Sequence, residues 1–197
     1  MTPKHPDRRQ RVLSTALLCF NERGVEATSI GDICAHAEAS VGSVYHHFGS
    51  KEGIVTALLA EGLRSNMQHL APKLLEARGA RDGVYAVVHS LIGWVVAHPD
   101  WARFIYANLG QSNRSATAEL AAVSTEYAQL IGTYFSPHIR AAAFRRLPEE
   151  CWAPLVLGPV HDYARRWLNG QVKTDIGAYA EVFADAAWNA VRNPDAR

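Results

Sequence analysis

The residues best suited to recognition chemistry lie between positions 28 and 51, in a stretch rich in hydroxyl, aromatic and imidazole side chains. Ser43 can donate to or accept from several bases, so it specifies a base sequence only weakly. Gly42 has no side chain, which permits close approach to a nucleic-acid backbone but costs about 1 kcal/mol in helix propensity. These residue types predict a polar and aromatic surface suited to a DNA groove.

Two short helices joined by a tight turn are expected to position this surface. Residues 30–37 and residues 41–48 each show the i, i+3, i+4, i+7 spacing of one buried helical face. The apolar positions are Ile30, Ile33, Cys34 and Ala37, followed by Val41, Val44, Tyr45 and Phe48. Thr28 and Ser40 precede the two runs, where a hydroxyl can cap unpaired backbone N–H groups. Two short helices that share a small core form a helix-turn-helix.

In a helix-turn-helix, the second helix enters the major groove with its N-terminal residues at base edges. The predicted reading surface comprises Val41, Gly42, Ser43 and His46 or His47. No metal site is expected at the two histidines, because adjacent side chains on a helix diverge and no third ligand has suitable spacing.

Plainer interpretations of the same residues stay open at this point. Thr28 and Ser40 could serve as helix caps alone, and Tyr45 could be a core residue alone. With few basic residues on the reading helix, we expect modest affinity for a single copy and reliance on a dimer.

The composition bounds the class of protein. The chain has 197 residues, 48% of them hydrophobic, which is ample for a packed core. No apolar run approaches the roughly 18 residues of a membrane span, and the N-terminus lacks the pattern of a secretory signal. We therefore expect a cytoplasmic protein without a membrane partner. Cys19, Cys34 and Cys151 are widely separated and suggest no disulfide framework.

The charge pattern gives only local support for nucleic-acid binding. The net charge is +1, so the chain as a whole is not basic. At the N-terminus, however, Lys4, Arg8, Arg9 and Arg11 face a single acid, Asp7, and could meet phosphates. A solvated helix start is the plainer interpretation of this cluster.

Every segment with clear periodicity is helical, so the fold class is all-α. A first helix is expected from Pro6-Asp7 to Gly24, and a connecting helix from Lys51 that Pro72 disturbs or ends. Further helical runs cover residues 82–98, 101–105, 115–139, 149–168 and 175–191. The expected organisation is a head at residues 1–50, a linker helix at residues 51–70, and a helical body at residues 71–197 that contains every tryptophan.

This combination of head, linker helix and helical body resembles the TetR family of bacterial transcriptional regulators. The resemblance rests on the pattern T-x4-I-x3-A-x2-S-x-G-x2-Y-x2-F-x2-K, carried by Thr28, Ile33, Ala37, Ser40, Gly42, Tyr45, Phe48 and Lys51. With Phe20 and Gly24, the match covers roughly residues 1–60, whereas the body matches weakly. Family members usually have glycine at the position of Glu38 and often an aromatic residue at that of Val25.

The resemblance implies a dimeric regulator that binds a pseudo-palindromic DNA operator, most simply a repressor released by a small molecule. It also implies that Tyr45, His46 and Lys51 contact phosphates, and that Thr28 and Ser40 bind phosphate through their hydroxyl and nearby N–H groups. No cofactor is expected. A regulator of the same fold controlled by a protein partner is the alternative.

The body is expected to hold both the dimer interface and an effector pocket. Paired apolar faces on the last two helices suggest a four-helix dimer interface made by Val156, Val160, Tyr163, Trp167, Val182, Phe183, Ala186 and Ala190. Aromatic and weakly polar residues suggest a pocket for an apolar or aromatic ligand, drawn from Tyr85, His89, Trp94, Phe104, Tyr106, Tyr127 and His161. Core packing is the plainer interpretation of each of these residues.

An enzyme is the rival class, and the sequence disfavours it. We find no nucleophile elbow, cysteine–histidine nucleophile setting, glycine-rich phosphate loop or metal-ligand cluster. His161 and Asp162 are the only acid/base neighbours in the body, and adjacent side chains on a helix point about 100° apart.

Overall fold

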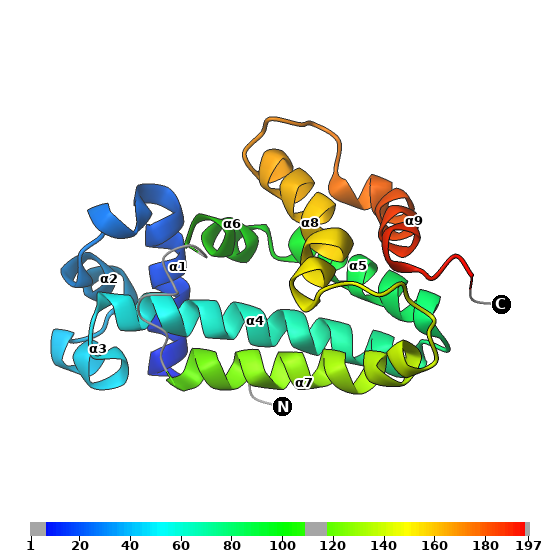
Figure 1. Cartoon of the computed structure of the whole chain (residues 1–197). Coiled ribbons are helices and arrows are strands. Elements are labelled where there is room, and N and C mark those ends of the chain that lie inside the picture. The colour runs from blue at the N-terminus through cyan, green and yellow to red at the C-terminus, as the bar shows by residue number, and fades with distance from the viewer. Residues whose placement is uncertain (1–6, 109–117, 196–197) are drawn as a thin grey trace, which may run out of the picture. The chain divides into compact units, whose positions relative to one another are not determined.

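A computed structural model describes residues 7–108 and 118–195. Its helices are α1 (Arg8–Ala27), α2 (Ile30–Ala37), α3 (Val41–Phe48), α4 (Lys51–Glu76), α5 (Ala80–Ala97), α6 (Pro99–Asn108), α7 (Ala118–Arg140), α8 (Glu149–Leu168) and α9 (Ala180–Val191), with a 3-10 turn η2 (Ile176–Tyr179) before α9 (Figure 1). Over these residues no strand forms, and the expected all-α class is confirmed.

The chain divides into two compact units, which we describe separately. The first unit comprises residues 1–63 and 100–124, and the second comprises residues 64–99 and 125–197. Helices α4 and α7 each contribute residues to both units. This division differs from the single cut predicted after residue 70, because α6 and the start of α7 group with the N-terminal helices.

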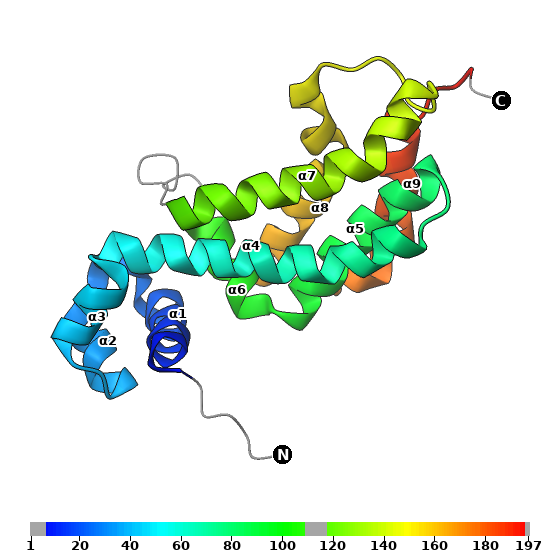
Figure 2. The ribbon, with the colours of Figure 1, turned by 90° about the horizontal axis from the view of Figure 1, so that it is seen from below.

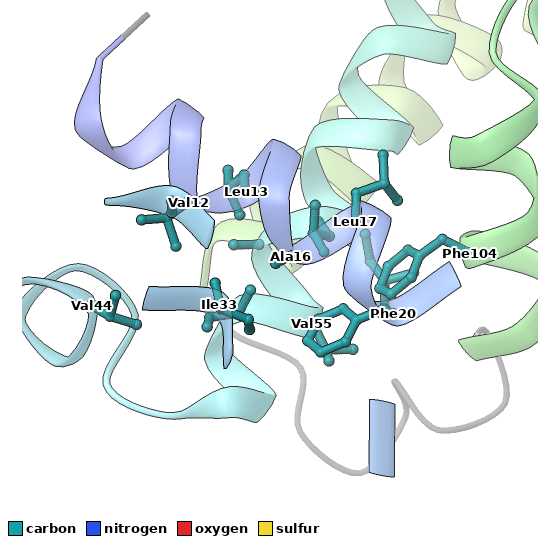
Figure 3. Close-up of a cluster of buried hydrophobic side chains, with 14 of the residues drawn as sticks. Val12, Leu13, Ala16, Leu17, Phe20, Ile33, Val44, Val55 and Phe104 are labelled. Carbon is teal, nitrogen blue, oxygen red and sulfur yellow. The ribbon is translucent and has the colours of Figure 1, made fainter. Parts of the chain in front are cut away.

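Helices α1 to α4 and α6 share the core of the first unit. Figure 3 shows side chains from these helices converging, among them Leu13, Ile33 and Val44, which are at most 1% exposed. The rings of Phe20 and Phe104 stack with centroids 5.9 Å apart and planes 16° apart. This stacking is the physical reason that α6 belongs to the first unit.

Local backbone chemistry sets the ends of the first helices. Gly24 interrupts α1 with φ +80° and ψ 161°, a conformation that glycine adopts without steric cost. The α2 cap is Ser29 and not Thr28 as predicted: the Ser29 hydroxyl accepts from the Asp32 N–H, and the Asp32 carboxylate accepts from the Ser29 N–H. This reciprocal capping box satisfies two donors that a helix start leaves unpaired.

In the second unit, α5 packs against both α8 and α9, and α8 packs against α9. The end of α4 lies beside α7 (Figure 2), where Leu70 and Leu74 pack with Tyr127, Leu130 and Ile131. The prediction that Pro72 disturbs or ends α4 is wrong as to its end, since the helix continues to Glu76. Pro72 is exposed and near the helix end, so only a local hydrogen bond is lost.

Among the described residues, no helix is long and apolar enough to cross a membrane.

Candidate DNA-binding surface and ligand cavity

Helix α3 separates buried and exposed side chains sharply. Val44 is 1% exposed and Phe48 is half-buried, so these two residues attach α3 to the core. Val41 and Tyr45 are 49% and 51% exposed, which corrects their assignment to the buried face. Because Tyr45 is outside the core, its plainer interpretation as a core residue is excluded.

The exposed surface of α3 presents polar groups at its N-terminus. The Ser40 hydroxyl accepts from the Ser43 N–H at 3.2 Å and caps the helix. Gly42, His46 and His47 are exposed, and a Cβ added at Gly42 would meet no atom within 4 Å. The start of α3 therefore has backbone N–H groups that are only partly paired. Because Gly42 has no side chain, an anionic phosphate backbone can approach them closely.

Thr28 does not belong to this surface. It is 1% exposed, and its hydroxyl donates to the carbonyls of Gly24 at 2.8 Å and Cys19 at 3.3 Å. The predicted contact between this hydroxyl and a phosphate is therefore corrected: the hydroxyl pairs carbonyls at the end of α1.

Lys51 also has an internal role that the sequence did not reveal. Its Nζ donates to the carbonyls of Val25 at 2.8 Å, Thr28 at 3.1 Å and Glu26 at 3.4 Å. An ammonium group has three donor hydrogens, so these carbonyls can occupy all of them. Lys51 therefore ties the start of α4 to the segment between α1 and α2, and the phosphate contact predicted for it is not supported by this geometry.

Glu38 occupies a backbone conformation that favours glycine, the residue expected at this position. It ends α2 with φ +51° and ψ +43°, the left-handed region in which glycine is favoured. Its side chain is exposed in the turn before α3. A carboxylate thus stands where the resemblance leads us to expect glycine.

The N-terminal basic residues divide into exposed and paired groups. Arg8 and Arg11 are exposed on α1, whereas Lys4 lies outside the described residues. Arg9 Nη2 lies 3.2 Å and 3.0 Å from the two carboxylate oxygens of Glu119 at the start of α7. The same guanidinium lies 5.6 Å from the centroid of the Phe48 ring. Arg9 therefore joins α7 to α3 within the first unit.

The second unit contains a cavity of about 580 Å³. Its walls come from α5, α7, α8 and the segment before α8, and are mostly apolar. The residues include Val84, Val87, Tyr127, Ile131, Phe135, Leu147, Trp152, Val156 and Leu157. This volume and composition are typical of a site for a small organic ligand.

Only Tyr127 among the predicted ligand residues lines this cavity. Phe104 and Tyr106 are in the first unit, where Phe104 belongs to the core. Trp94 is 3% exposed, and its indole N–H donates to the Ser65 hydroxyl at 3.0 Å. The prediction is corrected for these residues, because aromatic residues at helical spacing here fill cores.

The other predicted ligand residues face other elements. Tyr85 donates to Asp185 on α9 and accepts from Arg81, and His89 Nε2 lies 3.3 Å from a carboxylate oxygen of Glu181. His161 is half-buried on α8 outside the cavity wall. These groups form or border polar seams between helices rather than the cavity.

The predicted dimer residues fall into two groups. Val160 is 0% exposed and Val156 lines the cavity, so both face the interior of the protomer and are corrected as interface residues. Val182 is 63% exposed and Ala186 is exposed, so these two are available to a partner. The remaining four, Tyr163, Trp167, Phe183 and Ala190, are half-buried.

The packing of α8 explains the inward-facing residues. The apolar face of α8 packs against α5 and α9, which cover it within the protomer. Tyr163 packs edge to face against Tyr179 and Phe183, and its hydroxyl donates to the Thr174 carbonyl at 3.0 Å. The exposed apolar surface of these helices instead includes Leu155, Tyr179 and Val182.

The described residues contain no cluster of three or more histidine, cysteine or acidic side chains that could hold a metal ion. Cys19 and Cys34 are buried as expected, and no cysteine of the described chain forms a disulfide.

Comparison with known proteins assigns the N-terminal segment. Residues 12–58 match the family described as bacterial regulatory proteins, tetR family. The HTH-type transcriptional regulator Rv0196 of Mycobacterium tuberculosis is 36% identical over 80 residues, which cover 41% of this chain and 40% of that protein. The HTH-type transcriptional repressor KstR2 of Rhodococcus jostii is 26% identical over 159 residues, or 74% and 75% of the two chains.

Solved structures show the same fold across almost the whole chain. FadR from Bacillus subtilis, crystallised with stearoyl-CoA, aligns with a TM-score of 0.78 at 16% identity and covers 91% of this chain and 97% of its own. A TetR family regulator from Marinobacter aquaeolei aligns with a TM-score of 0.77 at 20% identity, covering 94% and 96%. These relatives are regulators, which agrees with the expectation that the chain is not an enzyme. Residues 12–58 thus carry a helix-turn-helix segment of the tetR family, and the fold of the chain is similar to that of a TetR family regulator.

Proposed function

We propose that this chain is a homodimeric, sequence-specific DNA-binding transcriptional repressor whose hold on its operator is relieved by an apolar ligand in the second-unit cavity. The observation that carries the DNA-binding part is the split face of α3. Val44 is buried while Val41 and Tyr45, on the same helix, are about half exposed. A helix anchored from behind with an open, capped N-terminus has the geometry required to enter a major groove.

The reading surface comprises the exposed residues Ser40, Val41, Gly42, Tyr45, His46 and His47 together with the half-buried Ser43. Val41 offers an apolar contact for a thymine methyl group, and Ser43 offers a hydrogen bond that tolerates several bases. Tyr45 and His46 are assigned to the phosphate backbone, which fixes register rather than sequence. Arg8 and Arg11 on α1 add positive charge that attracts phosphates.

A dimer supplies the affinity that one copy of this surface lacks. The exposed apolar positions on α8, η2 and α9 include Leu155, Tyr179 and Val182, and the small Ala186 of α9 is exposed as well. A two-fold interface uses the same patch on both copies, and α8 and α9 of each would form a four-helix bundle. Two α3 helices can then reach half-sites roughly 34 Å apart on a pseudo-palindrome.

The cavity supports an apolar effector. No lysine, arginine or histidine occurs among its lining residues, and most of them are aliphatic or aromatic. FadR of similar fold was crystallised with stearoyl-CoA, a molecule with a long apolar chain. We assign to this cavity a long apolar or aromatic moiety, with any strongly charged part of the ligand remaining outside it.

Helix α7 can carry the effect of a ligand towards α3. Helix α7 supplies cavity residues in the second unit and begins in the first unit at Ala118. There Glu119 binds Arg9, whose guanidinium also lies over the Phe48 ring of α3. Ligand binding needs to favour a non-binding arrangement by only about 1–3 kcal/mol to weaken operator binding several-fold to a hundredfold.

The test uses purified full-length protein and the DNA beside its own gene. We expect protection of two half-sites, and affinity that falls steeply as salt is raised, because phosphate contacts release counterions. The variant Tyr45→Ala should lose this protection while keeping its fold. Binding that hardly changes between low and moderate salt would contradict phosphate-anchored docking.

A further inference from the structure

The cavity wall contains one polar side chain whose hydrogen bond crosses to another helix. Among its lining residues, Tyr127, Ser136, Glu149 and Trp152 carry polar side-chain atoms, and the Trp152 indole is half-buried. Ser136 donates its hydroxyl to the Gly132 carbonyl of its own helix at 2.6 Å, and Glu149 is exposed in the first turn of α8. Tyr127 differs from Ser136 and Glu149, because its hydroxyl group bonds to a buried side chain of another helix.

That second side chain is Asn66 on α4, which is 8% exposed. The Tyr127 hydroxyl donates to Asn66 Oδ1 at 3.0 Å, while Asn66 Nδ2 is buried and has no hydrogen-bond partner. A buried amide donor without a partner is unfavourable in a folded protein. The Tyr127–Asn66 pair therefore holds more hydrogen-bonding capacity than the protein itself uses.

We infer that Tyr127, oriented by Asn66, is the specificity-determining residue of the cavity and donates a hydrogen bond to a neutral oxygen acceptor on the ligand. This inference rests on the proposed function, in which the cavity binds an effector. It adds that the effector is apolar over most of its surface but bears one uncharged acceptor, such as a ketone, ester or thioester carbonyl.

The hydrogens of the pair balance in both states. Without ligand, the Tyr127 O–H donates to Asn66 Oδ1. With ligand, a half-turn of the amide about its last bond lets Nδ2 donate to the tyrosine oxygen, which frees the O–H for the ligand. Nδ2 thereby gains a partner while Oδ1 gives up the one it had, so the amide keeps one unpaired group in each state, no proton is transferred, and no charge is created.

The surroundings favour a neutral acceptor over a carboxylate. Burial raises the pKa of Tyr127 to about 12, so the hydroxyl keeps its proton at physiological pH. The cavity has no lining cation to balance an anionic ligand, and Glu149 would repel one. A neutral oxygen needs only the single donor that Tyr127 provides.

The test compares two ligands of ten carbons each, butylbenzene and 4-phenylbutan-2-one, which share a shape and differ in one carbonyl. Binding to full-length protein is measured by calorimetry for the wild type, Tyr127→Phe and Tyr134→Phe. Tyr134 lies on the same helix and donates its hydroxyl to the Gly79 carbonyl, but it does not line the cavity. It is therefore a matched control for losing a buried tyrosine hydroxyl.

We expect Tyr127→Phe to weaken binding of the ketone about fivefold, which corresponds to the loss of one neutral hydrogen bond. The affinity for butylbenzene should stay within about twofold of the wild-type value. Tyr134→Phe should change neither. Equal effects of Tyr127→Phe on the two ligands would overturn the inference while leaving the cavity as a binding site. Failure of the wild type to bind either ligand would overturn the proposed effector site as well.

A second measurement needs no variant. Isotope-edited infrared spectroscopy of bound 4-phenylbutan-2-one in the wild-type protein reports hydrogen bonding at the carbonyl directly. We expect the carbonyl stretch to lie below its frequency in an alkane solvent. A stretch at the alkane frequency would overturn the inference even if Tyr127→Phe failed to fold.

Discussion

The exposed face of α3 and the cavity of the second unit are the two proposed recognition surfaces, and their side chains differ in polarity. The α3 face is open and rich in hydroxyl and imidazole groups, with glycine at its centre. The cavity is mostly apolar, and the Tyr127 hydroxyl in its wall already donates to Asn66. A charged, hydrated partner requires the first kind of surface, and an apolar molecule with a single polar group requires the second.

Attachment to the core also differs between the two regions. Helix α3 is short and is fixed by Val44 and Phe48, so its neighbouring residues serve either packing or recognition. In the cavity, Tyr127 serves both, since its ring packs with Leu70 and Leu74 while its hydroxyl is available for exchange. Substitutions should therefore separate stability from binding on α3 more cleanly than in the cavity.

The largest expected effects come from adjacent residues of α3. Tyr45→Ala removes an exposed ring, and we expect operator affinity to fall about tenfold to a hundredfold, from lost contacts in two half-sites, with unfolding free energy nearly unchanged. Val44→Ala is the matched control, because it should cost about 1–3 kcal/mol of stability through a core cavity. Gel-shift titration and denaturant unfolding measure the two quantities. Equal losses of stability in both variants would contradict the split face.

Lys51 tests whether a residue beside the reading surface acts on the fold or on DNA. Lys51→Met keeps the aliphatic stem but removes the ammonium that binds three carbonyls. We expect a loss of about 2 kcal/mol in unfolding free energy, with the salt dependence of operator binding unchanged under conditions where the variant is folded. A shallower salt dependence without loss of stability would instead assign Lys51 to phosphate.

Two glycines allow the same substitution to be compared in both regions. A Cβ added at Gly42 in α3 or at Gly132 in α7 meets no atom within 4 Å. Each Gly→Ala change should therefore raise stability by about 1 kcal/mol through helix propensity. Only Gly42→Ala should weaken operator binding, since its methyl group keeps the helix from the DNA. Unchanged operator binding by Gly42→Ala would argue against close approach at this position.

Glu38 offers a smaller test of the turn before α3. Glu38→Gly removes the steric cost of a left-handed backbone, which stabilises the folded state by about 1 kcal/mol. Glycine also makes the unfolded chain more flexible, which lowers stability by about 0.5 kcal/mol. We expect a small net gain in stability and tighter operator binding. Glu38→Gln separates the causes, because it removes the charge and keeps the strained backbone. Tighter binding in Glu38→Gly but not in Glu38→Gln would show that charge repulsion is not the cause.

The smallest effect concerns pH in the second unit. Burial, reinforced by neighbouring Arg165, lowers the pKa of His161 below its usual 6.5. The unfolded chain then binds more protons than the folded one, so stability falls as pH drops below about 6.5 and levels off below the folded pKa. Thermal unfolding from about pH 7.5 to about pH 5.5 should show this loss, and His161→Gln should show less of it. If His161→Gln leaves the dependence of stability on pH unchanged, another group is responsible. His69 is the next candidate, because its pKa is also lowered.

Local sequence signals predicted the first unit well. The Ser40 cap, the interruption at Gly24 and the buried Ile33 follow from short-range chemistry that a sequence displays directly. What the sequence did not show is which face of a short helix turns inwards. Val41 and Val44 look alike in sequence, and only packing against α1 and α2 distinguishes them.

The second unit was predicted less well for a related reason. Aromatic residues such as Trp94 and Tyr127 look equally suited to a core or a pocket, and the difference depends on contacts between distant helices. The Tyr127–Asn66 bond joins residues 61 positions apart, and no local pattern indicates it. The internal role of Lys51 was missed similarly, because its carbonyl partners lie across the head.

Hydroxyl-radical footprinting of the full-length protein on the DNA beside its own gene tests the central proposal most directly. If α3 reads the major groove in a symmetric dimer, two protected half-sites should lie on one face of the duplex, about 10 bp or a multiple of that apart. The Tyr45→Ala protein should protect neither half-site at the same concentration. A single unpaired footprint, or protection that survives Tyr45→Ala unchanged, would contradict the assignment of α3 as the DNA-reading element.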